Sequence, residues 1–165
     1  MNANTRYSFS PVTAADMALL AQWLNDPEVA RWFDDDEYLD ELESQLDKSH
    51  IRMQLVHFNN KPFAFVQDYD PRFWEDHHLF DLPEGSRGID TFIGNAEHMG
   101  HGHGTRYLGL LVADLLEQGA PALGIDPHPD NLRAQRAYQN VGFEAQGVVN
   151  NTRGTFLVML RYAQS

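Results

Sequence analysis

The sequence contains no cysteine. This absence excludes disulfide bonds, thiolate metal ligands and any acyl-cysteine intermediate. Basic residues are also scarce, because 12 Lys and Arg stand against 24 Asp and Glu, for a formal net charge of −12. A nucleic-acid backbone requires a basic face, so we expect no nucleic-acid partner. An acidic cleft would instead attract a polycation.

Long apolar runs are missing as well. None approaches the roughly 20 residues of a membrane span, and Met1–Arg6 lacks the apolar core of a signal peptide. We therefore expect no membrane association and a cytoplasmic location. The 165 residues, 42% of them hydrophobic, suffice for one buried core, so we expect a single domain over residues 1–165.

The hydrophobic periodicity predicts strands in hairpins followed by strands that alternate with helices. The expected strands are Tyr7–Phe9, Arg52–Phe58, Pro62–Tyr69, Gly88–Gly94, Ala122–Ile125, Glu144–Val149 and Thr155–Tyr162. The expected helices are Ala14–Leu24, a turn from Pro27, Asp36–Ser49, Tyr107–Glu117 and one that begins at Asn131. This order predicts an α/β fold with a mixed sheet and helices on both faces.

A glycine-rich loop follows the strand Gly88–Gly94. It reads Met99-Gly100-His101-Gly102-His103-Gly104-Thr105, and a helix comes after it. Glycines let backbone amides approach an anion, and the positive end of a helix attracts one, so the layout favours phosphate binding. The loop lacks the Gly-Lys-Ser/Thr ending of a Walker loop, and its glycine spacing does not fit a dinucleotide fingerprint.

A second motif lies in the helix that begins at Asn131. Tyr138 follows seven residues later, so both side chains lie on one face, two turns apart. Asn131-Leu132-Arg133-Ala134, Tyr138 and Val141-Gly142-Phe143 resemble the Asn-x-x-Ala…Tyr…x-Gly-Phe closing motif of the GNAT superfamily of acyl-coenzyme A N-acyltransferases. Met99–Gly104 resembles the Arg/Gln-x-x-Gly-x-Gly pyrophosphate loop of that superfamily, with Met99 in place of Arg or Gln. The resemblance covers the whole chain and implies a mostly antiparallel central sheet, splayed around the acyl-coenzyme A site.

A narrower resemblance concerns the acceptor. Gly88-Ile89-Asp90 and the run from Asp126 to Ala134 are similar to the aminoglycoside 6'-N-acetyltransferase branch. Related siderophore acyltransferases tend to carry His where this chain has Asp90. The resemblance implies direct acetyl transfer from acetyl-CoA to a primary amine of a small polycationic acceptor, and a role in antibiotic resistance. A siderophore precursor or a polyamine is the alternative acceptor, and a non-catalytic acyl-CoA-binding module is the alternative of another class.

The chemistry requires an acid and a base, because an aliphatic ammonium must lose a proton before it attacks a thioester. We expect Asp90 to bind the ammonium and to accept its proton, or only to bind it, since an ordinary Asp is a poor base. We expect Tyr138 to donate a proton or a hydrogen bond to the departing thiolate.

The resemblance also implies binding residues. Those expected to hold acetyl-CoA are Thr91, Phe92, Ile93, Met99, Gly100, His101, Gly102, His103, Gly104, Thr105 and Asn131. Those expected to bind the acceptor are Trp32, Trp74, Asp90 and Asp126. His98, His101 and His103 have a spacing that could suit a metal, but we expect pyrophosphate to fill the loop, its side chains to point outward and no metal to bind. The oligomeric state is left open.

Overall fold

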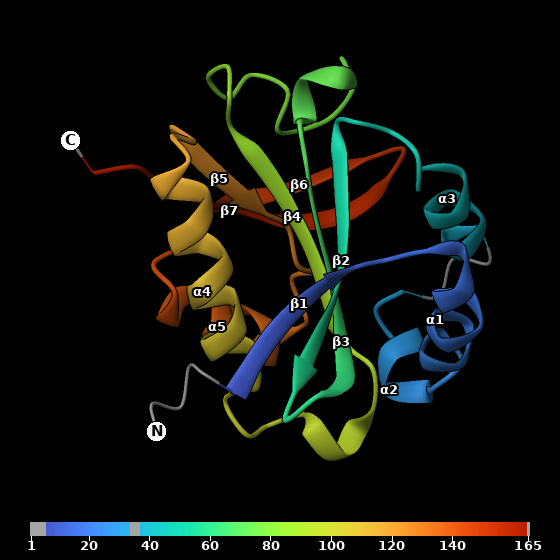
Figure 1. Cartoon of the computed structure of the whole chain (residues 1–165). Helices are drawn as coiled ribbons and strands as arrows, with labels where there is room; N and C mark the ends of the chain where they lie inside the picture. Colours follow the sequence, from blue (N-terminus) through green and yellow to red (C-terminus); the bar gives the residue numbers. More distant parts are fainter. Residues whose placement is uncertain (1–5, 34–36, 165) are drawn as a thin grey trace. The chain divides into compact units, whose positions relative to one another are not determined.

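The computed structural model describes residues 6–33 and 37–164 (Figure 1). Its strands form a seven-stranded sheet in the order β1-β2-β3-β4-β5-β7-β6. The strands are β1 (Tyr7–Pro11), β2 (Ile51–Phe58), β3 (Lys61–Tyr69), β4 (Arg87–Ile93), β5 (Ala122–Ile125), β6 (Glu144–Asn151) and β7 (Gly154–Tyr162). The pairs β1–β2, β5–β7 and β6–β7 are antiparallel and the pair β4–β5 is parallel, which confirms the predicted mixed sheet.

The helices are mostly short. They are α1 (Met17–Leu24), α2 (Pro27–Ala30), α3 (Tyr38–Ser44), α4 (His103–Glu117) and α5 (Leu132–Asn140). Three 3-10 turns are Ala14–Asp16, Pro71–Phe73 and Ala96–His98. No helix in the described ranges combines the length and apolar character that crossing a bilayer requires.

The chain forms two compact units, which share the strands β3 and β4. Unit 1 takes residues 1–67 and 91–103, and unit 2 takes residues 68–90 and 104–165. The expectation of one domain over the whole chain stays a prediction.

Unit 1 is built around the β2–β3 hairpin. Asn59 and Asn60 adopt positive φ values of 51° and 70°, as the two-residue turn between paired strands requires. Phe92 at the end of β4 lies on the ring of Phe65, with 5.2 Å between the ring centroids. The ring of Trp23 from α1 packs against the backbone at Gly94, where a Cβ atom would overlap it. Aromatic packing therefore fixes the end of β4 within this unit.

Unit 2 joins β5, β7 and β6 to α4 and α5. In the described part of unit 2, the side chains of Tyr107, Leu108, Leu123, Phe143 and Met159 are among the fully buried ones. At Gly104 the helix α4 faces α5, because a Cβ atom there would make an ordinary van der Waals contact of 3.8 Å with the Cβ of Ala137. Buried Tyr138 on α5 is thereby held beside α4.

The strand ends differ from the predicted ones by one or two residues, and the larger differences lie in three helices. The helix expected from Tyr107 already begins at His103, so that Gly104 and Thr105 of the glycine loop belong to its first turn. The helix expected from Ala14 begins with a 3-10 turn. A capping box between Thr13 and Asp16 stabilises the start of this turn. The helix expected over 36–49 spans Tyr38–Ser44, and Asp36 lies outside the described residues.

Gly88 on β4 generates a stability prediction. A Cβ atom at this position would overlap the buried ring of Tyr69. We expect Gly88→Ala to lower the free energy of unfolding by about 1–3 kcal/mol, as overpacking of a core does. Urea denaturation measures the change. Gly109→Ala is the matched control, because Gly109 lies in α4 with nothing within 4 Å of its Cβ position. That control should raise stability by about 1 kcal/mol, and equal losses in both variants would contradict the steric account.

Candidate functional site

The parallel pair β4–β5 brings two carboxylates to adjacent positions in unit 2. Gly88 pairs with Gly124 and Ile89 pairs with Ile125, so Asp90 and Asp126 are the next residues on their chains. Neighbouring strands lie about 4.8 Å apart, and side chains two residues apart share a face of the sheet. Pro127 follows Asp126 and lacks the N–H that further pairing would need. The two carboxylates therefore stand side by side where the pair ends.

The same face of β4–β5 is covered by the segment 69–86. The glycines leave room for it, because a Cβ atom at Gly88 would overlap the Tyr69 ring and one at Gly124 would lie 2.7 Å from the Leu79 side chain. Tyr69 and Leu79 are both buried. The residues between them, which include Trp74, His77 and His78, are thus held near the two carboxylates.

Tyr138 lies on α5 within reach of the charges on both carboxylates. Burial, followed by Tyr107, Asp90 and Asp126, raises the pKa of the Tyr138 hydroxyl well above its ordinary value of 10.0. The hydroxyl therefore keeps its proton at physiological pH and is a donor, as a group that protonates a leaving thiolate must be. Asn131 caps α5 by accepting a hydrogen bond from the Ala134 N–H at 3.2 Å. Its coenzyme contact stays a prediction.

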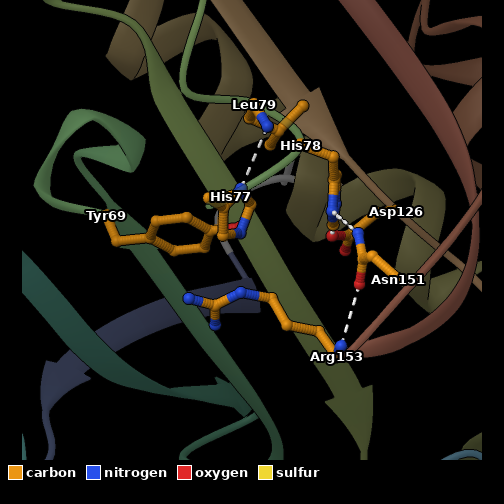
Figure 2. Close-up of polar contacts among 7 residues, drawn as sticks. All are labelled: Tyr69, His77, His78, Leu79, Asp126, Asn151 and Arg153. Carbon is orange, nitrogen blue, oxygen red and sulfur yellow. Dashed lines mark hydrogen bonds and ion pairs between the residues drawn. The ribbon is translucent and has the colours of Figure 1, made fainter. Parts of the chain in front are cut away.

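A hydrogen-bonded histidine cluster surrounds Asp126, as Figure 2 shows. His78 Nε2 lies 2.5 Å from Asp126 Oδ2, and the Asn151 amide nitrogen lies 3.4 Å from His78 Nδ1. The rings of His77 and His78 lie 4.4 Å apart. Trp74 packs on this cluster, because its ring contacts Tyr69 and His77. Two predicted acceptor residues, Trp74 and Asp126, thus belong to one cluster.

His77 is held as a neutral base. Its Nδ1 accepts a hydrogen bond from the Leu79 N–H at 3.0 Å, and its Nε2 lies 3.2 Å from the Tyr69 hydroxyl. Burial, followed by the charges of His78 and Arg153, lowers the pKa of His77 from 6.5 to about 4, although Asp76 acts in the opposite direction. His77 therefore stays uncharged at physiological pH.

His77, His78 and Asp126 also form the group that could hold a metal ion in the described ranges, with ligand atoms within 4.8 Å of one another. Hydrogen bonds already occupy some of their nitrogen and oxygen atoms: His77 Nδ1 accepts from the Leu79 N–H, and His78 Nε2 is hydrogen-bonded to Asp126. His98, His101 and His103 form no such group among the residues searched. The expectation of no metal stays a prediction.

The glycine loop lies in unit 1 and leads directly into α4. Gly100 and Gly102 adopt φ values of 77° and 80°, which only glycine adopts without strain, and both are exposed. Exposed backbone next to a helix N-terminus is suited to an anion, so the loop fits the pyrophosphate of a coenzyme. Met99 and Thr105 on either side are half-buried.

One expectation for this loop is wrong. The side chains were expected to point outward, but His103 is only 9% exposed and its Nδ1 lies 2.6 Å from the Tyr7 hydroxyl. Its ring packs on Phe58 and Phe63, with centroids 4.7 and 5.1 Å away. As the first residue of α4 it turns into the aromatic core of unit 1, and only its backbone can serve a phosphate. His101 is exposed, as expected.

The other predicted coenzyme residues of unit 1 have structural side chains. The Thr91 hydroxyl donates to the Phe65 carbonyl at 2.7 Å, and Phe92 is buried among aromatic rings. Any pantetheine contact at Thr91–Ile93 would therefore come from the backbone, as the sequence predicts. Trp32 lies half-buried in unit 1, with the Arg31 guanidinium 4.8 Å above its ring.

Sequence reasoning did not identify Asn151 or the link from His78 to Asp126. His78 and Asp126 lie 48 residues apart, and Asn151 and His78 lie 73 apart, so no local spacing signals their contact. The adjacent pair His77-His78 was the available hint.

Residues 12–151 match the model of the acetyltransferase (GNAT) domain family. The chain belongs to the GNAT acetyltransferase family. This finding confirms the family and the enzyme class that the two motifs predicted, and acetyl-CoA is the donor that such enzymes use.

Curated GNAT relatives include the aminoglycoside N(6')-acetyltransferase type 1 of Klebsiella pneumoniae. It is 29% identical over 178 residues, which cover 99% of this chain and 87% of the relative. The kanamycin resistance protein of Rhizobium radiobacter is 37% identical over 95 residues, which cover 57% of this chain and 84% of the relative.

The fold agrees with solved GNAT structures. The aminoglycoside acetyltransferase AAC(6')-Ib in complex with coenzyme A and kanamycin superposes with a TM-score of 0.82 at 29% identity, over 94% of each chain. The aminoglycoside N(6')-acetyltransferase of Legionella pneumophila gives a TM-score of 0.79 at 20% identity, over 96% of this chain and 92% of that one. The predicted GNAT-like fold is therefore confirmed.

Tyr138 generates the first prediction for the site. Tyr138→Phe removes the hydroxyl group, which is the proton donor of this side chain, and keeps the buried ring. We expect kcat to fall by about 10²-fold while the KM for acetyl-CoA changes by no more than about twofold, as the loss of a general acid does. Tyr162→Phe, at an exposed tyrosine of β7, is the control. Unchanged turnover in Tyr138→Phe would remove the acid role.

The lowered pKa of His77 generates a prediction on stability. Between pH 6.5 and about pH 4, His77 is protonated in the unfolded chain and neutral in the folded chain. The free energy of unfolding therefore falls as the pH decreases. After a discount for solvent screening we expect a loss on the order of 1 kcal/mol, measured by urea denaturation at pH 7 and pH 5. His77→Gln should lose less stability over this interval than the native chain, and His128→Gln, at an exposed histidine, should lose as much as the native chain.

Proposed function

We propose that this chain transfers an acetyl group from acetyl-CoA to the 6'-amino group of an aminoglycoside. The observation that carries the proposal is the pair Asp90 and Asp126 beside protonated Tyr138 in unit 2. Relatives that carry aminoglycoside acetyltransferase names, aligned over 99% of this chain, support the acceptor class.

The paired carboxylates suit a polycationic acceptor. An aminoglycoside brings several ammonium groups, and two adjacent carboxylates can bind two of them or hold one from both sides. The net charge of −12 favours the approach of such a molecule. Trp74 lies in the same cluster as Asp126 and supplies an apolar wall.

The reaction is a direct transfer. The ammonium gives one proton to Asp90, directly or through water, and the free amine attacks the thioester carbonyl. A C–N bond forms, the C–S bond breaks, and the nitrogen releases its second proton to water. The departing sulfur takes a proton or a hydrogen bond from Tyr138, whose raised pKa keeps that proton available until the thiolate develops. No covalent enzyme intermediate is needed, in keeping with the absence of cysteine.

We assign coenzyme binding to backbone groups and to the residue that caps α5. Within the proposal, the residues that hold acetyl-CoA are Thr91, Phe92, Ile93, Met99, Gly100, His101, Gly102, His103, Gly104, Thr105 and Asn131. The left-handed, exposed glycines of the loop support the pyrophosphate part of this assignment. A resistance role and a cytoplasmic location, where acetyl-CoA is available, complete the proposal.

The test is thiol release from acetyl-CoA with kanamycin-type aminoglycosides, spermidine and N-hydroxylysine side by side, followed by NMR of the acetylated product. We expect rapid turnover with aminoglycosides alone and acetylation of the 6'-amine. Turnover with spermidine or N-hydroxylysine alone would assign the enzyme to polyamines or to siderophore precursors. Tight acetyl-CoA binding without turnover of any amine would overturn the acceptor class.

Asp90 generates the prediction for catalysis. Asp90→Asn keeps the shape of the side chain and removes its negative charge. We expect acetyl transfer to fall by about 10²-fold or more while the melting temperature and acetyl-CoA affinity are retained, because both proton acceptance and ammonium binding are lost. Asp114→Asn, at an exposed residue of α4, is the control. Near-native activity in Asp90→Asn would show that another group takes the proton.

A further inference from the structure

Asp126, the proposed acceptor carboxylate, is itself held by a buried partner. The side chains of His78 and Asp126 are 5% and 11% exposed, and His78 Nε2 lies 2.5 Å from Asp126 Oδ2. A carboxylate withdrawn from water needs hydrogen-bond donors to stay ionised. In this environment His78 supplies one of those donors from a fixed direction.

The second nitrogen of His78 determines which proton it carries. The Asn151 amide group lies 3.4 Å from His78 Nδ1, and the Asn151 carbonyl oxygen accepts a hydrogen bond from the Arg153 N–H at 2.9 Å. Since that oxygen faces the Arg153 N–H, the NH₂ group faces His78 and donates to Nδ1. A neutral His78 then carries its proton on Nε2, where it donates to Asp126.

The chain of contacts is anchored at the tip of the β6–β7 hairpin. Asn151 is the last residue of β6, and the Arg153 guanidinium donates to Asp76 Oδ1 at 3.0 Å. The ring of Phe156 on β7 lies 4.9 Å from the ring of His78. The hairpin therefore contacts the segment 76–78 at Asp76 and at His78. Figure 2 shows the contacts of His78 with Asn151 and of Asn151 with Arg153.

We propose that His78 is a positioning residue, which the β6–β7 hairpin orients through Asn151 and which holds the Asp126 carboxylate in a fixed direction for an acceptor ammonium. This inference rests on the proposed function, in which Asp126 binds the acceptor. His78 uses Oδ2 and leaves Oδ1 of Asp126 for the ammonium. His78 does not act as the base. Its Nε2 already carries a proton, and its Nδ1 already accepts a hydrogen bond from the Asn151 amide.

If His78 has this role, the substitutions His78→Gln and His78→Phe should have different effects on the acceptor KM. Gln places an amide N–H where His carries Nε2–H, so His78→Gln should keep the acceptor KM within about threefold of the native value. His78→Phe keeps a ring but leaves the carboxylate without its donor. We expect the acceptor KM to rise about tenfold to a hundredfold, with the KM for acetyl-CoA unchanged. His128→Phe, at an exposed histidine two residues after Asp126, should change neither constant.

A double-mutant cycle tests whether His78 acts through Asp126. If it does, His78→Phe adds no more than about threefold to the acceptor KM in an Asp126→Asn background. Full additivity of the two effects would overturn the proposal, and so would a failure of Gln to rescue. Far-UV circular dichroism and the melting temperature identify a variant that fails to fold, and in that case the Gln variant and the following measurement decide.

The tautomer of His78 is measurable without any acceptor. Long-range ¹H–¹⁵N NMR of the native chain should show a proton on Nε2 and none on Nδ1. A proton on Nδ1 would overturn the hydrogen-bond chain whatever the acceptor is. Conversely, a confirmed Nε2–H tautomer in a chain that acetylates no aminoglycoside would reject the proposed function and leave the positioning of Asp126 intact.

Discussion

The parallel pairing of β4 with β5 is the constraint on which the candidate site of this protein depends. Its register aligns Ile89 with Ile125 and so brings Asp90 and Asp126 together from positions 36 residues apart in the sequence. Pro127 then ends the pairing, because it has no N–H to offer a neighbour. Two carboxylates at the end of a paired strand are a local concentration of negative charge, which attracts cations such as an ammonium.

The groups around these carboxylates differ in protonation. In the proposed reaction they therefore take different acid and base roles. Burial, more than any neighbouring charge, keeps Tyr138 protonated and His77 neutral. His78 carries a proton toward Asp126 and so cannot take one from a substrate. Asp90 stays the predicted acceptor of the substrate proton, directly after the paired residues of β4.

The coenzyme loop illustrates a different use of side chains. Its glycines give the backbone freedom to approach an anion, while His103 is buried among aromatic rings and bonded to Tyr7. A loop that must present backbone amides benefits from one fixed side chain, because a mobile loop would lose conformational entropy each time it bound a phosphate. The burial of His103 is therefore explained by its packing in unit 1.

The roles of the glycine loop, Asp90 and Tyr138 stay predictions, whereas the sequence by itself determined the family and the order of strands and helices along the chain, because these follow from local periodicity and short motifs. It did not reveal that α4 begins at His103, that the His103 side chain is buried, or that Asn151 and His78 hold Asp126. Each of these depends on contacts between residues 48 to 96 positions apart. Such contacts arise only when the sheet register and the β6–β7 hairpin are formed, and side-chain burial is a property of that packing rather than of any local pattern.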